Sequence, residues 1–310
     1  MYRNSIRYGA GLNKLNNRSA MTISRGNGFS GCMESEVPQK LLSVVIVNYN
    51  YGLYLEDAIL SVLSQNCDEV ELVVVDGGST DGSVDIIHKY ADRLGWWCSE
   101  RDNGQSDAFN KGFSHAKGKY LTWLNSDDIF VRGSLCKIVS ELRKHADCEW
   151  FTGNSVRFFN GGKVYQIWWG PHIYPRFLQR KNSPIAIFGP ASIFSKRVFD
   201  QVGGMNIRYH YAMDTDLWVR FCVLGVAQRR INCFCWGFRM HEASKTAEFG
   251  EHRLSQVAAD KLHAEVNESY EKWGYSCSRY LRFAMYMVRL VDFSFVRLIA
   301  YKLFLRRFHG

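Results

Sequence analysis

The sequence contains no uncharged apolar run that approaches the roughly 20 residues needed for a helix to span a bilayer. Its N-terminal stretch also lacks the apolar core of a secretory signal, because Arg3, Arg7 and Arg18 alternate with polar residues there. We therefore expect neither a membrane-spanning nor a secreted protein. Residues 1–39 are predicted to be a disordered or weakly ordered basic leader.

Paired cysteine motifs are missing as well. The nine cysteines are an odd number and irregularly spaced, and Cys233 and Cys235 form C-x-C rather than the C-x-x-C pairs of a zinc site. A disulfide framework and a structural zinc site are both disfavoured. Reduced thiols in a cytoplasmic protein are the expectation.

The charge is unbalanced, with 39 Lys and Arg residues against 30 Asp and Glu residues and a formal net charge of +9. A basic balance indicates an anionic partner: nucleic acid, an anionic membrane surface or a phosphorylated ligand. Nucleic acid is not expected, because the basic residues do not cluster on the half of the chain that carries the motifs described below.

Short apolar segments alternate with helical patterns from residue 41 onward. Strands are predicted at 41–47, 71–75, 96–98 and 120–124, and helices near 55–63, 84–90 and 106–115. Such alternation is typical of an α/β fold with a mostly parallel, Rossmann-like sheet flanked by helices. No G-x-G-x-x-G motif follows the first strand, which argues against a nicotinamide-dependent dehydrogenase.

The second half of the chain is less regular. A strand, helix and turn are predicted in 189–204, a helix in 211–221 and a long helix near 254–273. We predict a main domain over 40–250 and a helical, basic-amphipathic region over 251–310. Helices within 276–310 are predicted either to lie on an anionic membrane surface, at the inner face of the plasma membrane, or to pack on the main domain.

Polar clusters follow three of the predicted strands. They are NYN (48–50), DGGSTD (76–81) and NSDD (125–128). Ligands of open parallel sheets bind beyond the carboxyl ends of the strands. The topology therefore predicts one site formed by all three clusters.

The adjacent carboxylates Asp127 and Asp128 repel each other at the end of an apolar strand. One interpretation is a helix N-cap followed by a solvated acid. The other is a divalent cation, since Mg²⁺ and Mn²⁺ are commonly held by one or two carboxylates together with substrate phosphates. Such an ion neutralises a diphosphate leaving group, which indicates a metal-dependent enzyme acting on a nucleoside diphosphate compound.

Six blocks of the sequence together resemble glycosyltransferase family 2. They are VVIVNYNYGLYLEDAILSVLSQ (44–65), ELVVVDGGSTDGS (71–83), SERDNGQSDAFNKGF (99–113), YLTWLNSDD (120–128), AMDTDLWVR (212–220) and RMHEASKT (239–246). The resemblance covers about 41–246 and is closest to the bacterial enzymes of polysaccharide and cell-envelope biosynthesis. It implies a GT-A fold with a C-terminal helical extension.

The resemblance also implies an activity. The chain would be an inverting, hexosyltransferase-type enzyme that moves a sugar from a UDP-, GDP- or dTDP-sugar to a hydroxyl of a glycan or a lipid-linked acceptor. The alternative is a non-catalytic scaffold that binds a nucleotide sugar on the same fold. Retention of Asp128, Asp214 and His241 argues against the scaffold.

By position, the resemblance implies a nucleotide pocket formed by Asn48, Tyr49, Asn50, Asp76 and Gly77. It implies that Asp107, Lys111 and Asp127 lie along the nucleotide, the diphosphate and the sugar. Asp128 and His241 would hold the Mg²⁺ or Mn²⁺ ion in a DXD-like motif, although a histidine by itself is more often structural.

The general base implied by the resemblance is Asp214, which would deprotonate the acceptor hydroxyl. Asp216 is the rival. It lies about 200° away around the helix, so one carboxylate is expected to face the site while the other caps or pairs. Three positions depart from the family pattern by lacking an acid: Gly77, Asn125 and Met213. Trp168, Trp169 and Trp218 are as consistent with core packing as with a sugar platform.

Overall fold

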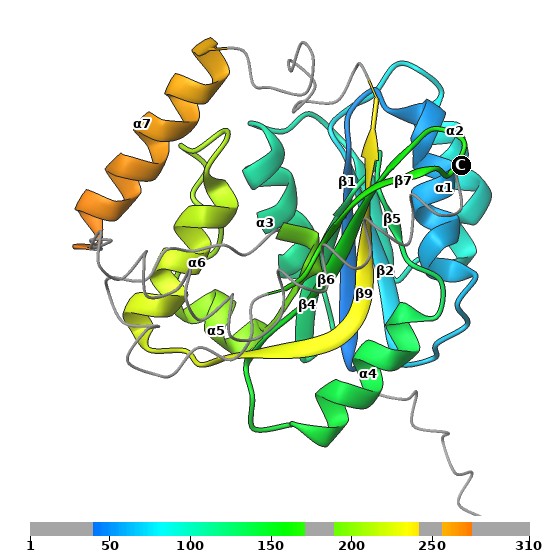
Figure 1. The fold of residues 1–310 in the computed structure, drawn as a ribbon. Helices are drawn as coiled ribbons and strands as arrows, with labels where there is room; N and C mark the ends of the chain where they lie inside the picture. Colours follow the sequence, from blue (N-terminus) through cyan, green and yellow to red (C-terminus); the bar gives the residue numbers. More distant parts are fainter. Residues whose placement is uncertain (1–39, 171–188, 242–255, 275–310) are drawn as a thin grey trace, which may run out of the picture. The chain divides into compact units, whose positions relative to one another are not determined.

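The structure is a computed structural model of the 310-residue chain and describes residues 40–170, 189–241 and 256–274. All of these residues belong to one compact unit. Within the described ranges, nine strands form a single sheet with the order β3-β2-β1-β4-β8-β6-β9-β5, and β7 pairs with β6 (Figure 1).

The first half of the sheet is parallel. It consists of β1 (Leu42–Asn48), β2 (Val70–Asp76), β3 (Trp96–Ser99) and β4 (Tyr120–Asn125). β1 lies between β2 and β4 and is buried along its whole length, which explains its nearly continuous apolar, β-branched sequence. The chain builds β2 and β3 on one side of β1 and then crosses to β4 on the other. The topological switch point therefore lies between β1 and β4.

The second half of the sheet is mixed. β8 (Ser192–Ser195) runs antiparallel to both β4 and β6 (Trp150–Phe159). The long strand β9 (Gln228–Met240) pairs in parallel with β6, with register shifts around Asn154. β5 (Ile129–Phe130) and β7 (Val164–Trp168) add antiparallel pairs to β9 and β6.

Helices cover both faces of the sheet (Figure 1). One face carries α1 (Gly52–Leu63), α2 (Ser83–Tyr90) and α4 (Ser134–Lys144), with the 3-10 helix η1 (Ala91–Arg93) after α2. The other carries α3 (Gln105–His115), α5 (Lys196–Gln201) and α6 (Met213–Leu224). A second 3-10 helix, η2 (Gly189–Ala191), precedes β8. α7 (Gln256–Lys272) packs against α6.

Three fully buried tryptophans join the sheet to α6. The ring centroid of Trp218 lies 5.7 Å from that of Trp123 in β4 and 5.4 Å from that of Trp150 in β6. Aromatic rings at such separations stabilise a core beyond the area that they bury. Trp218 is thus a core residue, whereas Trp168 and Trp169 are partly exposed.

The expected α/β architecture is confirmed. Each strand and helix predicted between residues 41 and 124 is present, and the predicted long helix near 254–273 is α7. The strands β6 and β9, by contrast, are not among the predicted elements. Of the helices in the described ranges, none is long and apolar enough to cross a membrane. The predicted amphipathic stretch 276–310 and the leader 1–39 lie outside the described residues.

Candidate active site

Three parallel strands end in polar side chains at one edge of the sheet. Asn48 of β1 is in register with Asp76 of β2, and Val47 is in register with Asn125 of β4. The ends of these strands therefore lie side by side, next to the switch point. The three polar clusters meet at this edge, as their positions in the sequence predict.

Asp76 organises the turn that follows β2. Its Oδ1 accepts hydrogen bonds from Asn48 Nδ2 (2.7 Å) and Ser79 Oγ (2.6 Å). Its Oδ2 accepts from the backbone N–H groups of Gly78 (3.1 Å) and Ser79 (2.8 Å) and from Ser99 Oγ (2.7 Å). Because protein donors engage both oxygens and the residue is fully buried, Asp76 shapes the loop from within. Its predicted contact with the nucleotide stays a prediction.

The environment of Asp76 favours its ionised form. Burial raises the pKa of this carboxyl, but the hydrogen bonds from Ser79, Ser99 and Asn48 outweigh that effect, and the net pKa is lowered. A carboxyl with a lowered pKa stabilises the fold above its unfolded pKa, and this contribution is lost as the pH falls through the folded pKa.

Replacing Asp76 by Asn is expected to lower the free energy of unfolding at pH 7 by about 2–4 kcal/mol, because an amide cannot accept from all five donors. The difference from wild type should shrink as the pH falls below about 4. Urea unfolding at several pH values measures it. Asp85→Asn, an exposed change on α2, is the control. A difference independent of pH would contradict the ionised network.

Polar contacts also join the loops after β1 and β2. The backbone N–H of Asn50 donates to Ser79 Oγ (2.8 Å), and Asn50 Oδ1 accepts from the backbone N–H of Thr80 (2.9 Å). The N–H of Gly52 donates to Asp81 Oδ2 (2.8 Å). Asn50 adopts a positive φ of 55°, a conformation that Asn tolerates better than most residues. The loop that begins α1 is therefore held by the glycine-rich turn.

Tyr49, Gly77 and Asp102 lie close together beside this network. A Cβ on Gly77 would lie 2.7 Å from Asp102 Oδ2 and 3.3 Å from the Tyr49 ring. The Tyr49 side chain is 62% exposed, and Asp102 Oδ1 accepts a hydrogen bond from the backbone N–H of Gly104 (2.8 Å). The Asp102 carboxylate thus occupies the space next to Gly77 that a larger side chain at position 77 would need.

The two adjacent aspartates of NSDD point to different partners. Asp128 is fully buried, and its Oδ1 accepts from the backbone N–H of Arg239 (2.9 Å). Its Oδ2 accepts from Trp236 Nε1 (3.0 Å) and Asn125 Nδ2 (3.1 Å). Burial, and then the charge of Asp127, raise the pKa of Asp128 well above its usual range. Asp128 therefore anchors β9 to the end of β4. Its metal-binding role stays a prediction, and the protein donors on both of its oxygens do not favour that role.

Asp127 is the carboxylate that lies beside the histidine. Its Oδ2 is 3.2 Å from His241 Nε2, and the ring of His241 packs 4.4 Å from the Tyr54 ring and 6.0 Å from the Tyr51 ring. Burial, followed by the charge of Asp127, raises the pKa of Tyr51. The Asp127 side chain keeps 15% of its surface exposed. The structure thus pairs His241 with Asp127, whereas the resemblance pairs it with Asp128.

Arg239 links this pair to α1, a role that sequence reasoning missed. Its Nε donates to the backbone carbonyl of Asp127 (2.8 Å), and its Nη2 lies 2.9 Å from Asp57 Oδ2. The guanidinium lies 5.2 Å from the centre of the Tyr54 ring, a cation–π arrangement. The signal was present, because Arg239 opens the block RMHEASKT. The residues of that block after His241 lie outside the described residues.

The two site residues predicted on α3, Asp107 and Lys111, already contact other groups of the protein. Asp107 Oδ2 accepts from the backbone N–H and Nδ2 of Asn103 (3.0 and 3.1 Å), and Lys111 Nζ lies 2.8 Å from Glu100 Oε1. The hydrogen bond to Glu100 raises the pKa of Lys111. Gln105 Nε2 donates to Asn125 Oδ1 (2.9 Å), so Gln105, rather than Asp107, connects α3 directly to the end of β4.

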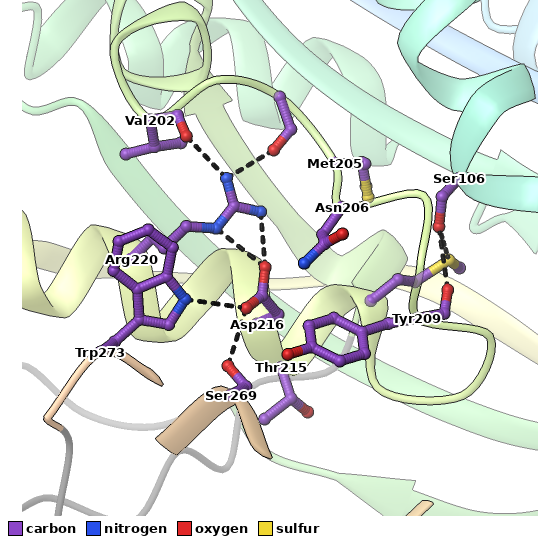
Figure 2. A network of polar contacts seen from close by, with 12 residues as sticks. Ser106, Val202, Met205, Asn206, Tyr209, Thr215, Asp216, Arg220, Ser269 and Trp273 are labelled. Carbon is purple, nitrogen blue, oxygen red and sulfur yellow. Dashed lines mark hydrogen bonds and ion pairs between the residues drawn. The ribbon is translucent and has the colours of Figure 1, made fainter. Parts of the chain in front are cut away.

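The two acids of α6 have separate environments. Asp216 is fully buried, and its Oδ2 pairs with Arg220 Nε and Nη2 at 2.8 Å (Figure 2). Asp214 lies in the first turn, half-buried, and its Oδ1 accepts from the N–H of Thr215 (2.7 Å). The expectation that one acid pairs inside the fold is met by Asp216. Asp214, the other acid of α6, does not take part in the ion pair with Arg220.

Comparison with protein families gives one match that spans just over half of the chain. The model of "Glycosyl transferase family 2" matches residues 43–203. A "PGL/p-HBAD biosynthesis glycosyltransferase" of Mycobacterium bovis is 28% identical over 184 residues, which are 58% of this chain and 69% of that protein. An uncharacterized glycosyltransferase of Nostoc sp. is 41% identical over 101 residues, covering 32% of this chain and 31% of that one.

Solved structures share the fold. TarS of S. aureus in complex with UDP-GlcNAc has a TM-score of 0.54 and 17% identity, with 76% of this chain and 73% of that one covered. In the UDP complex of TarS the covered share of that chain is 61%. The mannosyltransferase PcManGT of Pyrobaculum calidifontis, in complex with GDP-Man and Mn²⁺, has a TM-score of 0.51 and 15% identity, covering 81% and 79%.

These likenesses identify the sheet and its helices as a GT-A-like fold. The family match over residues 43–203 shows that the chain belongs to glycosyltransferase family 2.

Proposed function

We propose that the protein is an inverting glycosyltransferase that moves a hexose from a nucleoside diphosphate sugar to a hydroxyl of a glycan or lipid-linked acceptor in polysaccharide or cell-envelope biosynthesis. The observation that carries the proposal is the meeting of the polar clusters after β1, β2 and β4 beside the Asp127–His241 pair. The related structures bind UDP, UDP-GlcNAc and GDP-Man, which supports a nucleotide-sugar donor here.

The Asp127–His241 pair fits a divalent ion that is shared with a substrate. In the described ranges, no group of three or more His, Cys, Asp or Glu side chains converges as a metal site. Mg²⁺ and Mn²⁺ are nevertheless commonly bound through one or two protein ligands and substrate phosphates. Asp127 and His241 would therefore hold the ion, which when bound supplies charge neutralisation to the diphosphate leaving group.

In this mechanism Asp214 removes the proton of the acceptor hydroxyl as the oxygen attacks the anomeric carbon. The leaving diphosphate departs from the opposite face, so one displacement inverts the configuration at that carbon. Ser106 supports this arrangement, because its Oγ contacts the backbone carbonyl of Tyr209 and the sulfur of Met213 (both 3.3 Å) just before the base. The segment that leads to Asp214 is thereby tied to the start of α3, next to Asp107.

A donor screen tests the proposal. UDP-GlcNAc and GDP-mannose are each incubated with the protein and Mn²⁺, and nucleoside diphosphate release is followed with glycan acceptors or with water as the acceptor. We expect one donor to be consumed, and EDTA to stop the reaction. Binding of a nucleoside diphosphate without any turnover of either donor would instead support the scaffold alternative.

The proximity of Tyr49, Gly77 and Asp102 indicates which bases the donor carries. An exposed aromatic ring offers a stacking surface, and a carboxylate accepts from a ring N–H. Uracil, thymine and guanine present an N–H beside a carbonyl group, whereas cytosine presents a ring acceptor there. We therefore propose that Asp102 supplies the base-reading carboxylate that Gly77 lacks.

Asp102→Asn is expected to weaken UDP or GDP binding about 10- to 100-fold, because a charge-assisted hydrogen bond is lost. The bond from the N–H of Gly104 is retained, since an amide oxygen can also accept it. Calorimetric titration with UDP, GDP and CDP measures the effect, with Asp85→Asn as the control. Equal weakening for CDP and for the tightest-binding nucleotide would show that Asp102 does not read the base.

A further inference from the structure

Helix α7 and the residue that follows it contact the segment that carries Asp214 through three residues spaced four apart: Glu265 and Ser269 of α7, and Trp273 directly after its last residue. Ser269 Oγ (2.8 Å) and Trp273 Nε1 (3.1 Å) both donate to Asp216 Oδ1, as Figure 2 shows. Residues at i, i+4 and i+8 lie on one face of a helix. The same face of α7 therefore reaches both the buried acid of α6 and the turn that precedes α6.

Glu265 caps the start of α6 from a different helix. Its Oε1 accepts from the backbone N–H of His210 (3.1 Å), and its Oε2 accepts from the N–H groups of Tyr211 (2.7 Å) and Ala212 (2.8 Å). Ala212 is the N-cap residue of α6 and has no side chain that can cap. A carboxylate at this end of the helix also suits the helix dipole.

The remaining contacts fix α6 from its other side. Arg220 Nη1 donates to the backbone carbonyls of Val202 (2.8 Å) and Gly204 (2.6 Å), so the Asp216–Arg220 pair joins α7 to the turn after α5 (Figure 2). Asp214 lies two residues after the capped N–H of Ala212 and two residues before Asp216. Groups that α7 contacts therefore flank Asp214 on both sides in the chain.

We propose that α7 is a positioning element for the catalytic base, and that Glu265 is its principal positioning residue. This inference rests on the proposed function, in which Asp214 is the base. Glu265 contacts no reacting atom and acts through the backbone at 210–212. A displacement of about 1 Å at a reacting group costs about 100-fold in rate, so loss of this cap is expected to matter for turnover.

The experiment compares Glu265→Ala and Glu265→Gln with Glu271→Gln. Glu271 lies on the same helix with an exposed side chain and serves as the matched control. Hydrogen–deuterium exchange of amides 210–212 is expected to accelerate about tenfold in Glu265→Ala and to stay unchanged in Glu271→Gln. With UDP-GlcNAc or GDP-mannose and Mn²⁺, kcat should fall about 10- to 100-fold and the donor KM should change less than about twofold.

A double-mutant cycle separates positioning from general destabilisation. Because Glu265 acts through Asp214, Glu265→Ala should change the residual rate of Asp214→Asn by less than about twofold. The same rate loss in both backgrounds, or a wild-type rate despite faster exchange at 210–212, would overturn the inference. If Asp214→Asn itself keeps the wild-type rate, or the wild type consumes neither donor, the proposed function fails instead. Glu265→Gln, which keeps one acceptor oxygen, serves if the alanine variant does not fold.

Discussion

Asp214→Asn is expected to reduce kcat by about 10²–10⁴-fold, the usual contribution of a positioned general base. The change removes basicity while it keeps the size of the side chain and an oxygen that can accept from the N–H of Thr215. Nucleotide binding should stay within about threefold of wild type, because Asp214 lies in the first turn of α6 and not at the ends of β1 and β2. Initial rates and calorimetric binding measure the two quantities separately.

The matched comparison is the acid two residues later. Asp216→Asn is expected to lower both the activity and the urea concentration at the midpoint of unfolding, because it weakens a buried ion pair. Asp214→Asn should leave that midpoint nearly unchanged. If Asp214→Asn keeps more than half of the wild-type kcat with the active donor, the base is another residue.

Asp216→Ala is expected to destabilise the fold by about 3–5 kcal/mol, because it leaves the guanidinium of Arg220 buried without its counter-ion. Burial already lowers the pKa of Arg220, and the charge of Asp216 opposes that shift. Ser269 and Trp273 lose their acceptor at the same time. Urea unfolding followed by tryptophan fluorescence measures the loss.

The double variant Asp216→Leu with Arg220→Met gives the control for this prediction. Removing both charges avoids an unpaired buried ion, so part of the lost stability should return. Recovery will be incomplete, because the carbonyls of Val202 and Gly204 lose their donor. A double variant that is less stable than Asp216→Ala would show that the hydrogen bonds, rather than the unpaired charge, dominate.

The parallel half of the sheet was predictable because its signals are local. The run from Leu42 to Val47 is apolar and β-branched, and it is buried on both sides in the structure. The polar residues that end β1, β2 and β4 follow from the same pattern, since the strands are parallel and in register. The meeting of the polar clusters at this edge was therefore accessible from the sequence.

In the mixed half, the strand and helix predicted in 189–204 are present as β8 and α5, but β6 and β9 were not predictable, because their pairings are long-range. β9 carries Arg229, Arg230 and Arg239 and mixes buried with half-exposed positions, so it has no clean alternation. It pairs in parallel with β6, which lies far earlier in the chain, and the register shifts around Asn154. Such a strand is stabilised by its neighbours rather than by its own composition.

The same distance along the chain explains what sequence reasoning missed in the site. Asp128 accepts hydrogen bonds from Trp236 Nε1 and from the N–H of Arg239, and both residues lie more than 100 positions later in the chain. Nothing near NSDD reveals which of its two acids they engage. Glu265 is likewise 53 residues from Ala212, and no local motif connects a capping acid to a helix that far upstream.

The close approach of Asp102 to Gly77 also constrains how this site can diverge. An acid introduced at position 77 alone would place its Cβ 2.7 Å from Asp102 Oδ2, so the new side chain and the old one would compete for one space. The Asp102 side chain, whose Oδ1 accepts a hydrogen bond from the N–H of Gly104, would have to shift to make room. A larger residue at position 77 therefore requires the Asp102 side chain to move, and we expect the effects of substitutions at positions 77 and 102 to depend on each other.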